Sequence, residues 1–131
     1  MIDGVSQVML QVPVSDQEQA RAFWTETVGF ELVSDQELGS ERCIKVTPPD
    51  HKVVLVLGGP NPFLADFHGD LPAQLPHSPV FFTCDDIQKT YQELKAKGVR
   101  FAQPPVQMFF GWSALFCDPD GNRYAPNQRE R

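Results

Sequence analysis

The chain has 131 residues, with 11 lysines and arginines against 17 aspartates and glutamates, so its formal net charge is −6 at pH 7. This length fits one ordinary domain that buries a core without disulfides or a structural metal. The acidic balance argues against a nucleic-acid-binding surface and suits a cationic ligand slightly better than an anionic one. No apolar run approaches the roughly 18 residues of a membrane span, and the N-terminus lacks a basic segment followed by an apolar one. We therefore expect a cytoplasmic protein with no nucleic-acid or membrane partner.

The three cysteines indicate reduced thiols. They lie far apart inside apolar, strand-like runs and show no C-x-x-C spacing, which disfavours a disulfide or a zinc site. Buried thiols are expected at Cys43, Cys84 and Cys117. The three histidines are dispersed in or beside loops, where a solvated side chain is the default.

The chain opens with a predicted strand over residues 5–12. Apolar and more polar side chains alternate along it with a period of two, which is typical of a half-buried strand. Gln7, Met9 and Gln11 form its more polar side. One face of the strand is therefore expected in the core, and the other on a polar surface.

A helix and three strands follow. Ser15 and Glu18 have the spacing of a capping box, an apolar helical face comes next, and Gly29 is expected to end the helix. Runs rich in β-branched and apolar residues then predict strands over residues 30–34, 42–47 and 53–57. The first half of the chain therefore has the order β-α-β-β-β.

Residues 58–78 form a 21-residue connection that holds four prolines. Loops of this length are uncommon in compact domains and are usually linkers, lids or binding loops. A proline-rich linker and a flap that packs on the protein both fit this composition. The aromatic residues Phe63 and Phe67 would be unusual in a plain linker, and they favour the flap.

The second half repeats this order. Residues 80–84 predict a strand, Asp85 with Gln88 repeats the capping pattern, and an apolar helical stripe leads to Gly98. Further strands are predicted over residues 99–101, 106–110, 113–117 and 123–127. Between the last two lies a D-P-D-G-N turn, in which proline fixes φ and glycine supplies the left-handed conformation that a hairpin needs.

These patterns predict an α+β fold made of two βαβββ modules in a single domain over residues 1–131. Module one covers residues 1–57, the connection residues 58–78 and module two residues 79–131. The repeat lies in spacing and not in residue identity, with thirteen positions from Asp16 to Gly29 and thirteen from Asp85 to Gly98. Because neither module can bury a sheet face alone, we expect a curved mixed sheet around a cup, with the helices on its outer faces.

Several short motifs follow one another in a definite order. Residues 12–16 lead to Phe23-Trp24 and residues 28–30, Cys84-Asp85-Asp86-Ile87 leads to residues 98–99, and F-C-D-P-D-G-N ends the series. In this order and spacing the chain resembles the vicinal oxygen chelate superfamily, which includes glyoxalase I, extradiol dioxygenases and bleomycin-resistance proteins. The resemblance covers residues 4–127, and its last motif is the most specific part.

The resemblance implies four positions at which catalytic members of the family hold a divalent metal with His, Glu or Gln side chains. In this chain they correspond to Gln7, residues 52–57, Pro79 and Ala125. A glutamine is a weak ligand, residues 53–57 at the second position are apolar throughout, and proline and alanine have no ligating atom. The resemblance therefore implies neither a metal nor another cofactor here.

Strand alternation and the family topology turn a mixed set of side chains toward the interior of the cup. Amides, hydroxyls and a guanidinium among apolar walls are typical of a small-molecule pocket. In the alternative, a plain core, these polar groups would need to satisfy one another or bind water. Two phenylalanines before Gly111 either stack on a planar ligand at the rim or pack at a sheet edge. The candidate ligand-binding residues are Gln7, Met9, Gln11, Phe81, Thr83, Phe109, Phe110, Ser113, Leu115 and Arg123.

Three functions remain open at this point. The first is a metal-free protein that binds a small molecule and sequesters it, as bleomycin-resistance proteins do. The alternative is a metal-dependent lyase, isomerase or dioxygenase of the glyoxalase type with a non-standard metal site, although the spacing of His68 and His77 does not suggest one. The third is an interaction module whose cup is filled. No catalytic motif is present, so no catalytic residue is assigned, and the resemblance implies a homodimer.

Overall fold

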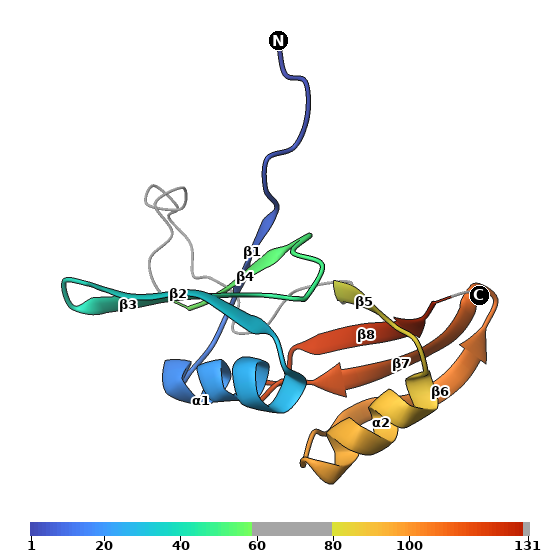
Figure 1. Ribbon diagram of the computed structural model, residues 1–131. Coiled ribbons are helices and arrows are strands. Elements are labelled where there is room, and N and C mark those ends of the chain that lie inside the picture. Colours follow the sequence, from blue (N-terminus) through green and yellow to red (C-terminus); the bar gives the residue numbers. More distant parts are fainter. Residues whose placement is uncertain (59–79, 130–131) are drawn as a thin grey trace. The chain divides into compact units, whose positions relative to one another are not determined.

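The computed structural model describes residues 1–58 and 80–129 (Figure 1). The chain divides into two compact units, Met1–Ala73 and Gln74–Arg131, and each is described by itself. The predicted connection, except Gly58, lies outside the described residues. The grouping of both modules into one domain therefore stays a prediction. No helix in the described part of the chain is long and apolar enough to cross a membrane.

The first unit holds one mixed four-stranded sheet with the strand order β1-β4-β3-β2. Strand β1 pairs with β4 in parallel, and the other neighbours are antiparallel. Its elements are β1 (Met9–Val12), α1 (Gln17–Ala22), a π-helical turn η1 (Phe23–Val28), β2 (Glu31–Leu38), β3 (Glu41–Thr47) and β4 (Val54–Leu57).

The second unit repeats this topology with the strand order β5-β8-β7-β6, and β5 is parallel to β8. Its elements are β5 (Val80–Cys84), α2 (Ile87–Ala96), β6 (Phe101–Met108), β7 (Gly111–Cys117) and β8 (Arg123–Gln128). The predicted α+β fold of two βαβββ modules is confirmed. The cup depends on how the modules are placed relative to each other and stays an expectation.

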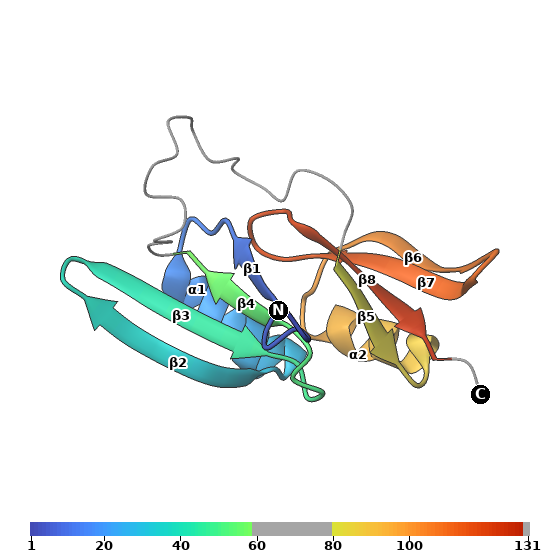
Figure 2. The same ribbon diagram turned by 90° about the horizontal axis from the view of Figure 1, so that it is seen from above.

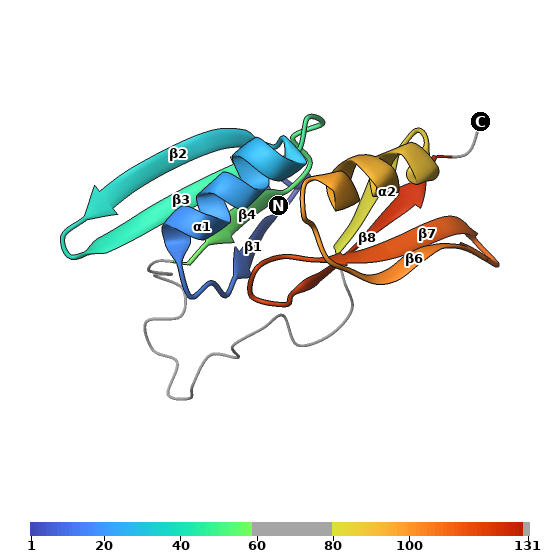
Figure 3. The same cartoon turned by 90° about the horizontal axis from the view of Figure 1, so that it is seen from below.

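In each unit the helix lies on one face of its own sheet. The strands of both units lie in front of their helices in Figure 2, and the helices lie in front of the strands in Figure 3. Each sheet therefore has a helix-covered face and a second face, which we call the helix-free face. The cores hold fully buried side chains that each contribute about 1.5–3 kcal/mol. The largest of them are Trp24, Tyr124, Phe116, Ile44, Leu55, Leu57 and Ile87.

Both helices begin one residue later than the sequence indicated. The N-cap of α1 is Asp16 and not Ser15, and its carboxylate accepts a hydrogen bond from the backbone N–H of Gln19 at 3.0 Å. The N-cap of α2 is Asp86 and not Asp85, with the equivalent bond from Lys89 at 3.2 Å. Aspartate is as strong an N-cap as serine, so the backbone conformation decides between adjacent candidates. The predicted ends are confirmed, because the glycines at 29 and 98 have φ of 91° and 90°.

Several predicted strand boundaries are wrong, since β2 runs on to Leu38 and β7 begins at Gly111. Strand β1 begins at Met9, so residues 5–8 precede it. The predicted strands at 99–101 and 106–110 are one strand, β6, which continues through Pro104 and Pro105. Because β6 is an edge strand, it tolerates prolines that cannot donate to a neighbour, and its pairing with β7 shifts register around them. Phe109 and Phe110 lie in the turn after β6 and not in a strand.

Candidate functional site

The helix-free face of the first unit is identified by β3. The Arg42 side chain of β3 reaches Glu18 of α1 at 2.9 Å, so residues 42, 44 and 46 face the helix and residues 43, 45 and 47 face away. Strand pairing then sets one row of side chains across all four strands of this face. The row runs Gln11, Val56, Lys45 and Ser34.

Of the three predicted site residues in this unit, the sheet places two on the helix-free face. Met9, next to Val54, is 47% exposed, and Gln11 is half-buried. The Gln11 side-chain amide donates to the carbonyl oxygen of Gly58 at 3.2 Å. Gln7 is exposed and precedes β1, so strand pairing does not fix its side chain on this face.

The helix-free face of the second unit follows from its aromatic core. The ring of Tyr91 on α2 lies 4.7 Å from that of Phe101, whose ring lies 6.1 Å from Phe116. Phe116 in turn stacks on Tyr124 at 5.3 Å. These aromatic residues are on the helix-covered face, and the residues that alternate with them face away. On the opposite face lie Phe81, Thr83, Gln103, Ser113, Leu115, Cys117, Arg123, Ala125 and Asn127.

A polar row crosses three strands of this face. Asn127 in β8 pairs with Thr83 on one side and with Ser113 on the other. The Ser113 hydroxyl donates to the side-chain oxygen of Asn127 at 2.6 Å, which leaves the Asn127 amide hydrogens as donors. Phe81 is 58% exposed beside the row. The predicted residues of β5, β7 and β8 therefore share one face of one sheet.

The tip of the β6–β7 hairpin is aromatic and exposed. Phe109 is 101% exposed and Phe110 43%, and their rings meet edge to face at 5.0 Å. Met108 at 41% and Trp112 at 36% exposure extend this surface, and sequence reasoning missed both. The sequence does hold a signal for this apolar surface, because no residue from 101 to 117 carries a charge. An exposed apolar patch of this kind is typical of a binding or association surface.

Sequence reasoning also missed Lys45 and Gln103. Lys45 lies on the helix-free face of the first unit, and Gln103 pairs with Leu115 on that of the second. Alternation within the predicted strand 42–47 set Lys45 apart from its apolar neighbours. The sequence did not show which side of that strand the helix covers.

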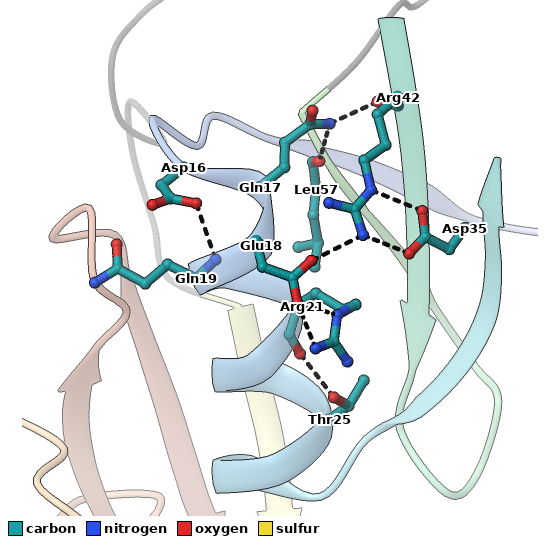
Figure 4. A network of polar contacts seen from close by, with 9 residues as sticks. All are labelled: Asp16, Gln17, Glu18, Gln19, Arg21, Thr25, Asp35, Arg42 and Leu57. Atoms are coloured by element: carbon teal, nitrogen blue, oxygen red, sulfur yellow. Dashed lines mark hydrogen bonds and ion pairs between the residues drawn. The ribbon is translucent and has the colours of Figure 1, made fainter. Parts of the chain in front are cut away.

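A charged network lies on the other side of the first sheet (Figure 4). Glu18 bridges Arg21 and Arg42, and Arg42 binds both oxygens of Asp35 at 2.8 and 2.6 Å. Hydrogen bonds from Arg21 and Arg42 lower the pKa of Glu18, and the bonds from Arg42 lower that of Asp35. Their stabilising effect is present at neutral pH and is lost as the pH falls through these lowered values. The network ties α1 to β2 and β3, and its role is structural.

The D-P-D-G-N turn is held by a buried carboxylate. Asp118 is 5% exposed and its oxygens accept hydrogen bonds from the backbone N–H of Asp120 and of Asn122. They also accept from the Asn122 side-chain amide and the Tyr124 hydroxyl, each at 2.8 Å. Burial, and then the charge of Asp118, raises the pKa of Tyr124 far above its ordinary range. This motif fixes the β7–β8 turn and presents no reactive group.

The residues present do not fit the divalent metal of the family's catalytic members. Strand β4, at the second ligand position, is apolar and buried along its whole length. Ala125, at the fourth, is 2% exposed and has no donor, and Pro79 lies outside the described residues. Within residues 1–58 and 80–129, no three His, Cys, Asp or Glu side chains are grouped to hold a metal. The three cysteines are free thiols, and burial raises the pKa of Cys84.

Two βαβββ modules with mixed sheets define a recognised class of protein. Residues 5–125 match the family described as the Glyoxalase/Bleomycin resistance protein/Dioxygenase superfamily, and the chain belongs to it. It is 35% identical over 112 residues to the uncharacterized protein YetH of Bacillus subtilis (strain 168), a match that covers 85% of this chain and 88% of YetH.

Solved structures give the same result. TnmS3, an antibiotic binding protein from Streptomyces sp. CB03234, is similar with a TM-score of 0.76 and 33% identity, over 98% of this chain and 100% of TnmS3. A superfamily member from Sphaerobacter thermophilus DSM 20745 has a TM-score of 0.76 and 31% identity, over 95% of this chain and 98% of its own.

Proposed function

We propose that this protein binds a small molecule on the helix-free face of one of its sheets and sequesters it without chemical change. The observation that carries this proposal is the mixture of side chains on the second unit's helix-free face. The polar row of Thr83, Asn127 and Ser113, in which the Ser113 hydroxyl donates to Asn127, lies beside the exposed Phe81. Apolar surface with a few fixed polar groups is the usual composition of a ligand site.

Two further observations support binding over catalysis. The side chains at the family's metal positions do not fit a divalent metal, because those of β4 and Ala125 have no atom that could coordinate one. TnmS3, to which the chain is similar at 33% identity, is described as an antibiotic binding protein. We propose the same broad role here, with no metal and no cofactor.

The proposal is tested by a thermal-shift screen of cationic antibiotics, aromatic metabolites and divalent metals. A ligand present at a hundred times its Kd stabilises the folded state by about 2.7 kcal/mol and raises the melting temperature accordingly. Metal analysis of the purified protein accompanies the screen. Stoichiometric metal that resists dialysis would contradict metal-free binding and favour the lyase, isomerase or dioxygenase alternative.

Matched variants locate the site. Gln11→Ala tests the helix-free face of the first unit and Arg123→Ala that of the second, and at least one of them is expected to abolish the shift given by the best ligand. Gln88→Ala and Arg100→Ala remove the same chemical groups from exposed positions and should keep the shift. If the control variants Gln88→Ala and Arg100→Ala also lose the shift, the loss is not specific to a site. If neither Gln11→Ala nor Arg123→Ala loses it, the ligand does not bind on a helix-free face.

We further propose a cytoplasmic homodimer. The exposed aromatic surface at Phe109, Phe110 and Trp112 supports association, because apolar surface of this kind is unfavourable in water. Light scattering coupled to size exclusion gives the mass in solution. A monomeric mass at micromolar concentration would refute the dimer and leave the binding proposal standing.

A further inference from the structure

One half-buried cation of the first unit has no ion pair with any residue in 1–58 or 80–129. Lys45 lies in the inner strand β3, on the helix-free face, between Ser34 in β2 and Val56 in β4. Among the lysines and arginines of residues 1–58 and 80–129, the other half-buried ones are Arg21 and Arg42. Both are held by the carboxylate of Glu18. Among the cations that the structure describes, Lys45 alone combines partial burial with the absence of a salt bridge.

We infer that the ligand carries a carboxylate and that Lys45 binds this group on the helix-free face of the first unit. This inference rests on the proposed function. The Lys45 side chain is half-buried on this face and pairs with the buried Val56, so its cation stands beside apolar surface. A ligand carboxylate would supply a counter-charge that none of the described residues supplies to Lys45.

The surroundings of Lys45 would strengthen such a contact. Next to it, Cys43, Val54 and Val56 form an apolar cluster in which each residue is at most 9% exposed. Apolar surroundings lower the local dielectric constant, so opposite charges attract more strongly than in water. Ser34, on the next strand of the same face, adds a hydroxyl donor.

The acidic residues on this face do not neutralise the lysine. Glu31 is engaged by His51, whose Nε2 lies 2.6 Å from its carboxylate. Glu41 is four residues from Lys45 along β3, which corresponds to about 13 Å in an extended strand. No ion pair joins Lys45 to either of them within the described residues.

A ligand carboxylate has the opposite charge to the cationic ligand that the net charge of the protein favours. The overall charge of −6 affects long-range encounter, which salt screens over about 8 Å at physiological ionic strength. A contact between Lys45 and a carboxylate is much shorter than that distance. The local field at the site therefore decides the sign of the bound group.

The experiment compares 1-naphthoate with 1-naphthamide, which differ in charge and little in shape, by calorimetric titration. Wild-type protein is expected to bind naphthoate about tenfold more tightly than naphthamide, the factor that one charge-assisted contact provides. Lys45→Met should reduce this preference to less than about twofold. Lys89→Met removes an exposed lysine on α2 and should retain it.

A second measurement separates binding from folding. Lys45→Met is expected to be at least as stable to urea as wild type, since it replaces an uncompensated charge by an apolar chain of similar length. Three results would overturn the inference. Wild type would bind the two probes with equal affinity, Lys45→Met would keep the preference for naphthoate, or naphthoate would not bind at its solubility limit. The broader binding proposal fails only if no compound of the thermal-shift screen binds.

Discussion

Replacing Tyr124 by phenylalanine removes one hydrogen bond from the buried carboxylate of the β7–β8 turn. The Tyr124 side chain is fully buried, and its hydroxyl donates to Asp118 at 2.8 Å. A hydrogen bond to a charged group contributes roughly 1.5–3 kcal/mol to stability. Asp118 keeps the side-chain amide of Asn122 on the same oxygen, so we expect Tyr124→Phe to lose about 2 kcal/mol at pH 7.

The same substitution has a defined dependence on pH. The pKa of Tyr124 is raised in the folded protein, so the folded state keeps the phenol proton while the unfolded chain loses it above about pH 10. The stabilisation is complete below that pH and falls as the pH rises. One unit higher, at pH 11, the advantage of wild type over Tyr124→Phe should be smaller by about 1.4 kcal/mol.

Urea unfolding followed by far-ultraviolet circular dichroism at pH 7 and pH 11 measures both effects. Tyr91→Phe is the control, because the other tyrosine only accepts a hydrogen bond from Lys95 on the helix surface. A difference between wild type and Tyr124→Phe below about 0.5 kcal/mol at pH 7 would refute the hydrogen-bond argument. A difference that is the same at both pH values would refute the pKa argument.

Two further substitutions test local backbone features by the urea midpoint. Gly58→Ala should cost more than Gly39→Ala, by about 1–3 kcal/mol. Both glycines have φ of 69°, but only the methyl at position 58 would lie 2.8 Å from the Val14 side chain. If the two glycine substitutions lower the free energy of unfolding equally, the steric clash at position 58 is contradicted. Asp86→Ala should lower the free energy of unfolding by about 1 kcal/mol through loss of the N-cap, whereas Asp85→Ala should change it by less than about 0.5 kcal/mol. The reverse order would show that the cap is misassigned.

The sequence predicted the repeated fold because the fold depends on local signals. Helix ends at Gly29 and Gly98 follow from the left-handed conformation that glycine adopts most readily. Strand faces follow from alternation, so the predicted residues of β5, β7 and β8 share one face. The helix starts were misplaced by one residue because adjacent Ser15 and Asp16, or Asp85 and Asp86, satisfy the same pattern.

What the sequence could not predict depends on tertiary position. Pro104 and Pro105 interrupted the predicted strand, but they are compatible with β6 because it lies at a sheet edge. The assignment of Lys45 to the helix-free face required knowing that Arg42 reaches α1. Gln7 was placed on the site because alternation extends before Met9, whereas the pairing with β4 begins only there.

The parallel pairing within each module has a consequence for the order of folding. Met9 pairs with Val54, 45 residues later, and Val80 pairs with Tyr124, 44 residues later. The first strand of each module therefore has no partner until the last strand of that module exists. Antiparallel hairpins such as β2–β3 and β6–β7 can form early from local contacts, while β1 and β5 must wait. Each module is thus expected to close late in folding, with its first strand docking onto a hairpin already formed.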